Sequence, residues 1–82
     1  MTEKPAEVIV YTSPMCVPCE QLKSYLKHLG VSFRVRDLLM DEEAQDRLDE
    51  ARIRSTPALE VGGVLYAGSE LTPEKVRTLV GL

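Results

Sequence analysis

Residues 8–19 have the sequence VIVYTSPMCVPC, and this stretch decides the fold. Its first four residues are a continuous apolar run bounded by polar residues and proline, which is typical of a strand buried on both faces. We therefore predict a central strand here. Cys16 and Cys19 follow where a helical pattern opens, so the first sulfur lies at the positive end of a helix and within reach of the second. That is the geometry of a reversible disulfide.

The residues that follow predict a helix and then a second strand. A helix over 16–29 is indicated by apolar side chains at helical spacing, and Gly30 comes next, where a helix C-terminus favours a left-handed residue. The stripe consists of Leu22, Tyr25, Leu26 and Leu29. Residues 31–37 alternate, which predicts a strand near a sheet edge, covered on one side only. Its covered face would carry Val31, Phe33 and Val35.

A second helix is expected over 41–52. Acidic residues crowd its start, where the helix dipole favours them. Its buried stripe would be Ala44, Leu48 and Ala51. Two i,i+4 pairs, Glu43 with Arg47 and Glu50 with Arg54, indicate a solvated face rather than a docking surface.

The C-terminal third predicts a hairpin and a last helix. Gly62 and Gly63 separate the short apolar runs 58–61 and 64–67, which is a strong hairpin signal. Thr72 then caps a helix with proline at its first position and with Val76, Leu79 and Val80 facing inward. The order is β-α-β-α-β-β-α, an α/β protein. A right-handed crossover makes the first two strands parallel, and the glycine turn makes the last two antiparallel.

Length and composition narrow the class of protein. The 82 residues suffice for one small domain, 1–82, in which 1–6 form a loose tail. With 44% hydrophobic residues and two cysteines, neither a disordered chain nor a disulfide-rich scaffold fits. The net charge is −3 and the basic residues are scattered, so we expect no nucleic acid and no membrane as partner. With no signal segment or apolar span, we expect a cytoplasmic protein. We also expect a monomer.

The placement of the cysteines assigns their roles. Unpaired backbone N–H groups at the helix start stabilise a thiolate, so Cys16 is the expected nucleophile. Cys19 lies one turn further on and is better shielded, so it is the expected resolving thiol. Pro18 stiffens this turn at little cost, because the first turn of a helix does not use its missing N–H.

Three alternatives compete with a redox role. A structural bridge of this length would stabilise the fold by only roughly 2 kcal/mol and would be reduced in the cytoplasm. A zinc site would need further ligands, and His28 lies about 18 Å along the same helix from Cys16. The same distance keeps His28 from acting as a base, and a helix C-terminus suits its charge. A soft-metal carrier for Cu(I) or zinc would use Met15, Cys16 and Cys19.

The motifs resemble those of the glutaredoxin branch of the thioredoxin superfamily. The cysteine motif is followed about forty residues later by Ser55-Thr56-Pro57 and then by Gly68-Ser69-Glu70. The resemblance covers nearly the whole chain from Val8 onward and implies a thioredoxin fold, with a four-stranded mixed sheet flanked by three helices. It implies a dithiol–disulfide oxidoreductase without a bound cofactor. It also implies that Pro57 is cis and that the backbone of Thr56 pairs with substrate.

The same resemblance implies a wider set of substrate- or glutathione-binding residues and leaves the reductant open. The set is Ser13, Met15, Val17, Arg54, Ser55, Thr56, Pro57, Gly68, Ser69 and Glu70. Glutathione-using members usually carry Cys-Pro-Tyr-Cys and a lysine three residues before the first cysteine; this chain has Val17-Pro18 and Ser13 there. The motif is also similar to that of small redoxins that reduce ribonucleotide reductase. Those proteins are recharged by thioredoxin reductase and NADPH, so either reductant is possible.

Overall fold

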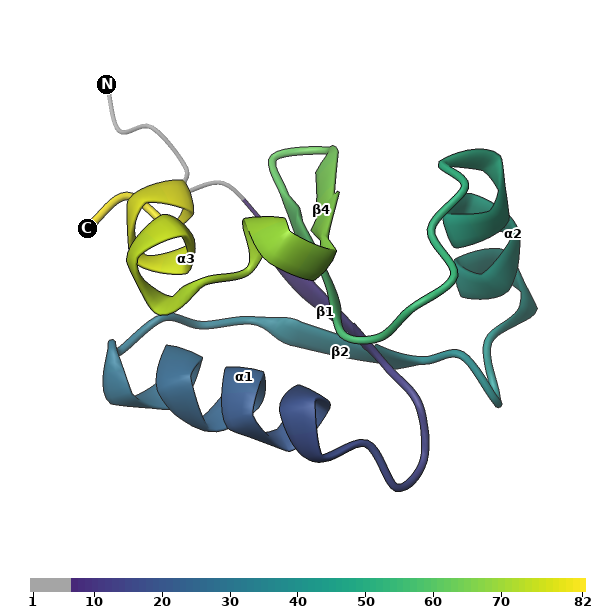
Figure 1. Cartoon of the computed structure of the whole chain (residues 1–82), viewed down its shortest axis with the longest axis horizontal. Coiled ribbons are helices and arrows are strands. Elements are labelled where there is room, and N and C mark those ends of the chain that lie inside the picture. The colour runs from purple at the N-terminus through teal and green to yellow at the C-terminus, as the bar shows by residue number, and fades with distance from the viewer. Residues whose placement is uncertain (1–6) are drawn as a thin grey trace.

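The computed structural model describes residues 7–82, and the predicted tail, 1–6, lies outside the described residues (Figure 1). Within 7–82 the element order confirms the predicted β-α-β-α-β-β-α arrangement, with a short 3₁₀ turn, η1, before the last helix. The elements are β1 (Val8–Thr12), α1 (Val17–His28), β2 (Arg34–Asp37), α2 (Glu42–Glu50), β3 (Ala58–Val61), β4 (Val64–Ala67), η1 (Gly68–Glu70) and α3 (Pro73–Leu79).

The described strands form one mixed sheet in the order β2-β1-β3-β4. β1 is parallel to β2 and antiparallel to β3, and β3 is antiparallel to β4 across the glycine turn. The sequence-based predictions of a central β1, an edge β2 and a C-terminal hairpin are therefore confirmed.

All five residues of β1 are buried, and alternate side chains serve opposite faces of the sheet. Val8 and Val10 pack in one cluster with Leu22 and Leu26 of α1 and Val76 of α3. On the other face, Ile9 and Tyr11 pack with Ala44 and Leu48 of α2. In Figure 1, α1 and α3 accordingly lie near each other and α2 lies apart from them.

The second strand is shorter than predicted. It begins at Arg34 rather than at residue 31, because the preceding residues close α1. Gly30 has a φ of 75°, and the N–H of Val31 donates to the carbonyl of Leu26 at 3.0 Å, a Schellman-type ending. The predicted burial of Val35 is also wrong: it is 48% exposed, because β2 is the edge of the sheet.

The second helix is also shorter than the predicted 41–52. Asp41 is its N-cap and accepts a hydrogen bond from the N–H of Ala44 at 3.0 Å. Ala51 is exposed rather than buried, because it is the C-cap. The predicted side-chain pairs are not formed among the described residues. Arg47 pairs with Glu60 of β3 instead of Glu43, and Arg54 lies past the helix end.

A polar network connects the centre of the sheet with α2. The hydroxyl of the fully buried Tyr11 donates to Glu60 Oε1 at 2.6 Å, and Arg47 Nε donates to the same oxygen at 2.8 Å. Burial raises the pKa of the Glu60 carboxyl, but the hydrogen bonds from Arg47 and Tyr11 outweigh it, and the pKa lies below its ordinary value. The network therefore favours the ionised carboxylate.

This network predicts that stability falls at acid pH. Because the folded pKa of Glu60 is depressed, the unfolded chain takes up the proton first, so the free energy of unfolding falls as the pH drops below about 4.5. Glu60→Gln should lower it by about 1 to 2 kcal/mol at neutral pH and flatten the acid decline. Urea denaturation across the pH range measures both effects. Glu50→Gln, an exposed carboxylate, is the control, and a Glu60→Gln profile parallel to that of the unchanged protein would contradict the prediction.

Candidate active site

The cysteine pair lies at the start of α1, directly after the loop that follows β1. Cys16 is the N-cap of α1 and has an extended backbone, and its sulfur accepts a hydrogen bond from the N–H of Cys19 at 3.2 Å. The two cysteines form a disulfide with their Cα atoms 5.2 Å apart. The predicted position of Cys16 at the helix N-terminus is thus confirmed. There the backbone N–H groups and the helix dipole favour negative charge on its sulfur.

The two sulfurs differ in their access to solvent. Cys19 is fully buried, whereas Cys16 is partly exposed. Met15, which precedes Cys16, has a φ of 56°, a left-handed conformation that is uncommon for a residue with a side chain. Its side chain is fully exposed, and that of Val17 is 65% exposed. A substrate can therefore reach the Cys16 sulfur from solvent, whereas the Cys19 sulfur is shielded by the protein.

A hollow surrounds the exposed side of Cys16. We call it the Cys16 hollow, and it has a volume of about 670 Å³. It is lined by Met15, Cys16, Val17, Glu20, Gln21 and Ser24. Glu20 is paired with Lys23 at 2.6 Å, so the carboxylate that faces this hollow is largely compensated.

Thr56 reaches Cys16 from the loop before β3. Its hydroxyl donates to Cys16 Sγ at 3.6 Å, within range for a sulfur acceptor. Ser13, from the loop after β1, has its hydroxyl oxygen 2.8 Å from that of Thr56. The Thr56–Pro57 peptide bond is cis, as the resemblance implied. Two loops that are forty residues apart thus meet at the reactive sulfur.

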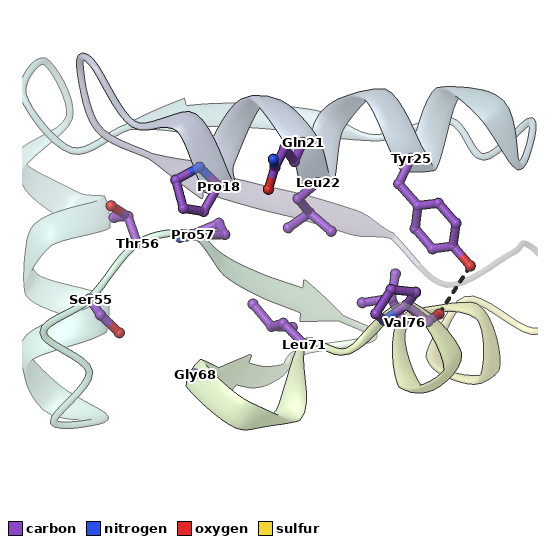
Figure 2. Close-up of a pocket in the computed structure, with 11 residues that line it drawn as sticks. Pro18, Gln21, Leu22, Tyr25, Ser55, Thr56, Pro57, Gly68, Leu71 and Val76 are labelled. Atoms are coloured by element: carbon purple, nitrogen blue, oxygen red, sulfur yellow. Dashed lines mark hydrogen bonds between the residues drawn. The ribbon is translucent and has the colours of Figure 1, made fainter.

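A groove runs from Pro57 between α1 and the η1–α3 segment, and Figure 2 shows the side chains that line it. We call it the Pro57 groove, and its volume is about 450 Å³. Pro18, Leu22 and Leu71 point into the space, and Tyr25 closes one end with a hydrogen bond from its hydroxyl to the carbonyl of Pro73 at 3.1 Å. None of the described residues that line it is a lysine, arginine or histidine. The surface is therefore suited to apolar ligand groups.

The predicted site residues fall into three places. Met15 and Val17 line the Cys16 hollow, and Ser55, Thr56, Pro57 and Gly68 line the Pro57 groove. Arg54 and Glu70 line a separate pocket of about 390 Å³ on the other side of Ser55 and Gly68. Ser13 contacts Thr56, and Ser69 is exposed on η1. The structure brings the hydroxyl residues to the sulfur but does not bring Arg54 into the groove.

Sequence patterns missed part of the lining. Gln21 faces both the Cys16 hollow and the Pro57 groove, and Tyr25 and Leu71 wall the groove. Leu22 and Tyr25 belonged to the predicted buried stripe of α1, so periodicity gave no sign that one end of this stripe is open. Gln21 carried a weak signal, because it is a polar residue next to that stripe and within two turns of the cysteines.

Residues 7–82 contain no group of three or more histidine, cysteine, aspartate or glutamate side chains arranged to hold a metal ion. Among the same residues, no helix has the length and apolar character needed to cross a bilayer.

A mixed four-stranded sheet with three helices and a strand-to-helix cysteine pair beside a cis proline defines a thioredoxin-fold protein. A family model described as Glutaredoxin matches residues 8–66, and the chain belongs to this family. The thioredoxin-like protein BC3987 is 35% identical, with a TM-score of 0.78 over 89% of this chain and 99% of that one.

Two other proteins are similar to this chain, one in its fold and one in part of its sequence. The glutaredoxin-like NrdH-redoxin from Escherichia coli has a TM-score of 0.79 at 23% identity, covering 89% of this chain and 93% of that one. The Gene 56 protein of Mycobacterium phage L5 is 44% identical over 41 residues, half of this chain. That match spans 40% of the length of the curated relative.

The short span of the disulfide predicts that it adds little to stability. A bridge over three residues closes a small loop, so reducing it should lower the free energy of unfolding by about 2 kcal/mol or less. Urea denaturation of the oxidised and the fully reduced protein measures the difference. Loss of the folded state on reduction would instead mean that the bridge is structural.

Proposed function

We propose that the protein is a dithiol–disulfide oxidoreductase that reduces disulfides of other proteins by cycling Cys16 and Cys19. The observation that carries the proposal is the asymmetry of the pair. Cys16 is accessible, caps α1 and accepts hydrogen bonds from the Cys19 N–H and the Thr56 hydroxyl, whereas Cys19 is buried behind it. Such an environment stabilises the Cys16 thiolate as the nucleophile and keeps Cys19 shielded until the second step.

The reaction takes two exchange steps. The Cys16 thiolate attacks one sulfur of the substrate disulfide, forms a mixed disulfide and expels the other sulfur, which takes up a proton. Cys19 loses its proton and attacks Cys16 Sγ, which releases the second substrate thiol and leaves the Cys16–Cys19 disulfide. The substrate gains two electrons and two protons, and an external reductant returns the same number to the protein. We expect this cycle to run in the reducing cytoplasm.

For the reductant we favour thioredoxin reductase with NADPH over glutathione. Glutathione carries two carboxylates, and the described lining of the Pro57 groove offers no cationic side chain to pair with them. Burying an unpaired carboxylate is costly, whereas a protein reductant can dock apolar groups there. Arg54, which the glutathione interpretation would use, lines the separate pocket beyond Ser55. Ribonucleotide reductase is then a candidate electron acceptor.

Single cysteine variants test the cycle. Cys16→Ser should abolish reduction of insulin disulfides, because no nucleophile remains at the exposed position. Cys19→Ser should stop turnover but accumulate a covalent adduct with the substrate, visible by non-reducing electrophoresis and mass spectrometry. Equal residual turnover in both variants would contradict the assigned roles. Stoichiometric Cu(I) or zinc binding without any reductase activity would favour the soft-metal carrier.

A recycling assay tests the choice of reductant. The oxidised protein should be reduced by thioredoxin reductase and NADPH, and much more slowly by glutathione with its own reductase. Gln21→Glu puts a carboxylate where groove and hollow meet, so it should raise the KM of the thioredoxin-reductase reaction several-fold. Ser32→Glu makes the same charge change just before β2, which its parallel pairing with β1 puts at the other end of the strands from Cys16, and serves as the matched control. Preferential recycling by glutathione would overturn this choice while leaving the cysteine cycle intact.

A further inference from the structure

The hydroxyls of Ser13 and Thr56 form a chain that ends at the reactive sulfur. The Ser13 and Thr56 oxygens are 2.8 Å apart, and the Thr56 oxygen is 3.6 Å from Cys16 Sγ. Ser13 and Thr56 are both partly buried. The resemblance assigned Ser13 to substrate binding, but the structure turns its hydroxyl to Thr56.

The direction of this chain follows from counting hydrogens. A hydroxyl has one hydrogen to donate and two lone pairs to accept with. If Thr56 donates to Cys16 Sγ, it has no hydrogen left for Ser13, so Ser13 must be the donor of the 2.8 Å bond. The opposite direction, Thr56 donating to Ser13, would leave the sulfur without this hydroxyl donor. The two directions therefore differ in what they offer to Cys16.

The redox state of Cys16 sets how strongly the first direction is favoured. A disulfide sulfur is a weak acceptor, so the hydrogen bond that Thr56 donates to it in this structure is weak. A thiolate is charged, and hydrogen bonds to charged groups are markedly stronger than those between neutral groups. Formation of the thiolate should therefore align both hydroxyls toward the sulfur, and each bond in such a chain polarises the next.

We propose that Ser13 is a positioning residue for the redox reaction. By donating to Thr56 it turns the Thr56 hydrogen toward Cys16 and stabilises the thiolate through a relay of two hydroxyls. The inference rests on the proposed role of Cys16 as nucleophile. The Cys16 thiolate is already stabilised by the Cys19 N–H and by the N-terminus of α1. The hydroxyl relay is a third source of stabilisation, and it comes from outside α1.

The charged surroundings of Cys16 are held constant in the test. Among the described residues that line the Cys16 hollow, the titratable side chain is Glu20, and it is paired with Lys23 of the same helix. From the loop before β3, the group that contacts the sulfur is the uncharged Thr56 hydroxyl. Substitution of a hydroxyl therefore changes no charge at the site.

The experiment measures the pH at which Cys16 ionises. All variants carry Cys19→Ser, so that Cys16 is the single thiol of the chain, and thiolate formation is followed by ultraviolet absorbance. Thr56→Val should raise the midpoint by about one pH unit, which makes the thiolate about tenfold scarcer at a fixed lower pH. Ser13→Ala should raise the midpoint by about half a pH unit, which makes the thiolate about threefold scarcer. Ser13→Thr, which keeps the hydroxyl, should restore the midpoint, and Ser32→Ala, far from the site, should leave it unchanged.

A double variant separates a relay from two independent effects. Because Ser13 acts only through Thr56, Ser13→Ala combined with Thr56→Val should shift the midpoint no further than Thr56→Val alone. Additive shifts would overturn the relay. So would a Ser13→Ala variant that loses stability in urea but keeps its midpoint, since Ser13 would then only bridge two loops. If Thr56→Val fails to fold, Ser13→Ala in a Thr56→Ser background decides, with the same threefold loss expected.

The same measurements separate this proposal from the proposed function. If Cys16 ionises at low pH and Cys16→Ser is inactive, but Ser13→Ala has no effect on the midpoint, the relay fails and the oxidoreductase stands. If Cys16 of the Cys19→Ser protein ionises like an ordinary free thiol, the proposed nucleophile itself fails.

Discussion

The burial of β1 on both faces is the constraint on which the rest of the structure depends. A strand of five buried residues needs helices on each side of the sheet, and α1 with α3 covers one face while α2 covers the other. Its parallel pairing with β2 brings α1 back across the sheet. The carboxyl end of β1 is where the chain leaves the core, so the loop that holds Cys16 starts from a fully buried central strand.

The polar network between β1, α2 and β3 fixes the strand that follows the Thr56–Pro57 loop. Tyr11 of β1 and Arg47 of α2 both donate to Glu60 of β3. These bonds tie β3 to β1 in the observed register, in which Ala58 pairs with Tyr11. Because Pro57 directly precedes β3, the same register sets the loop that carries Thr56 beside the cysteines. A charge cluster remote from the sulfurs thus helps to position a group that touches one of them.

Two hollowed surfaces lie beside the cysteine pair. The Cys16 hollow exposes the sulfur between apolar side chains that project into solvent, and the Pro57 groove extends this surface toward α3. A docking polypeptide would cover both, because Gln21 lines both of them. Under the proposed function, the lack of cationic side chains among the described groove residues favours a protein partner over a small thiol that carries two carboxylates. Under the proposed function, α1 contributes to both surfaces, and the loop before β3 and the η1–α3 segment complete the Pro57 groove.

The sequence by itself determined the element order, the central strand, the hairpin and the cysteine pair at the start of α1, because these depend on local periodicity, turn residues and capping. It did not determine the length of β2 or the burial of Val35, since a helix ending and a sheet edge depend on neighbours. Local spacing also suggested Glu43 as the partner of Arg47, whereas tertiary packing supplied Glu60. Only the folded chain brought Ser13 and Thr56 together at Cys16, because a contact between loops forty residues apart leaves no trace in local pattern.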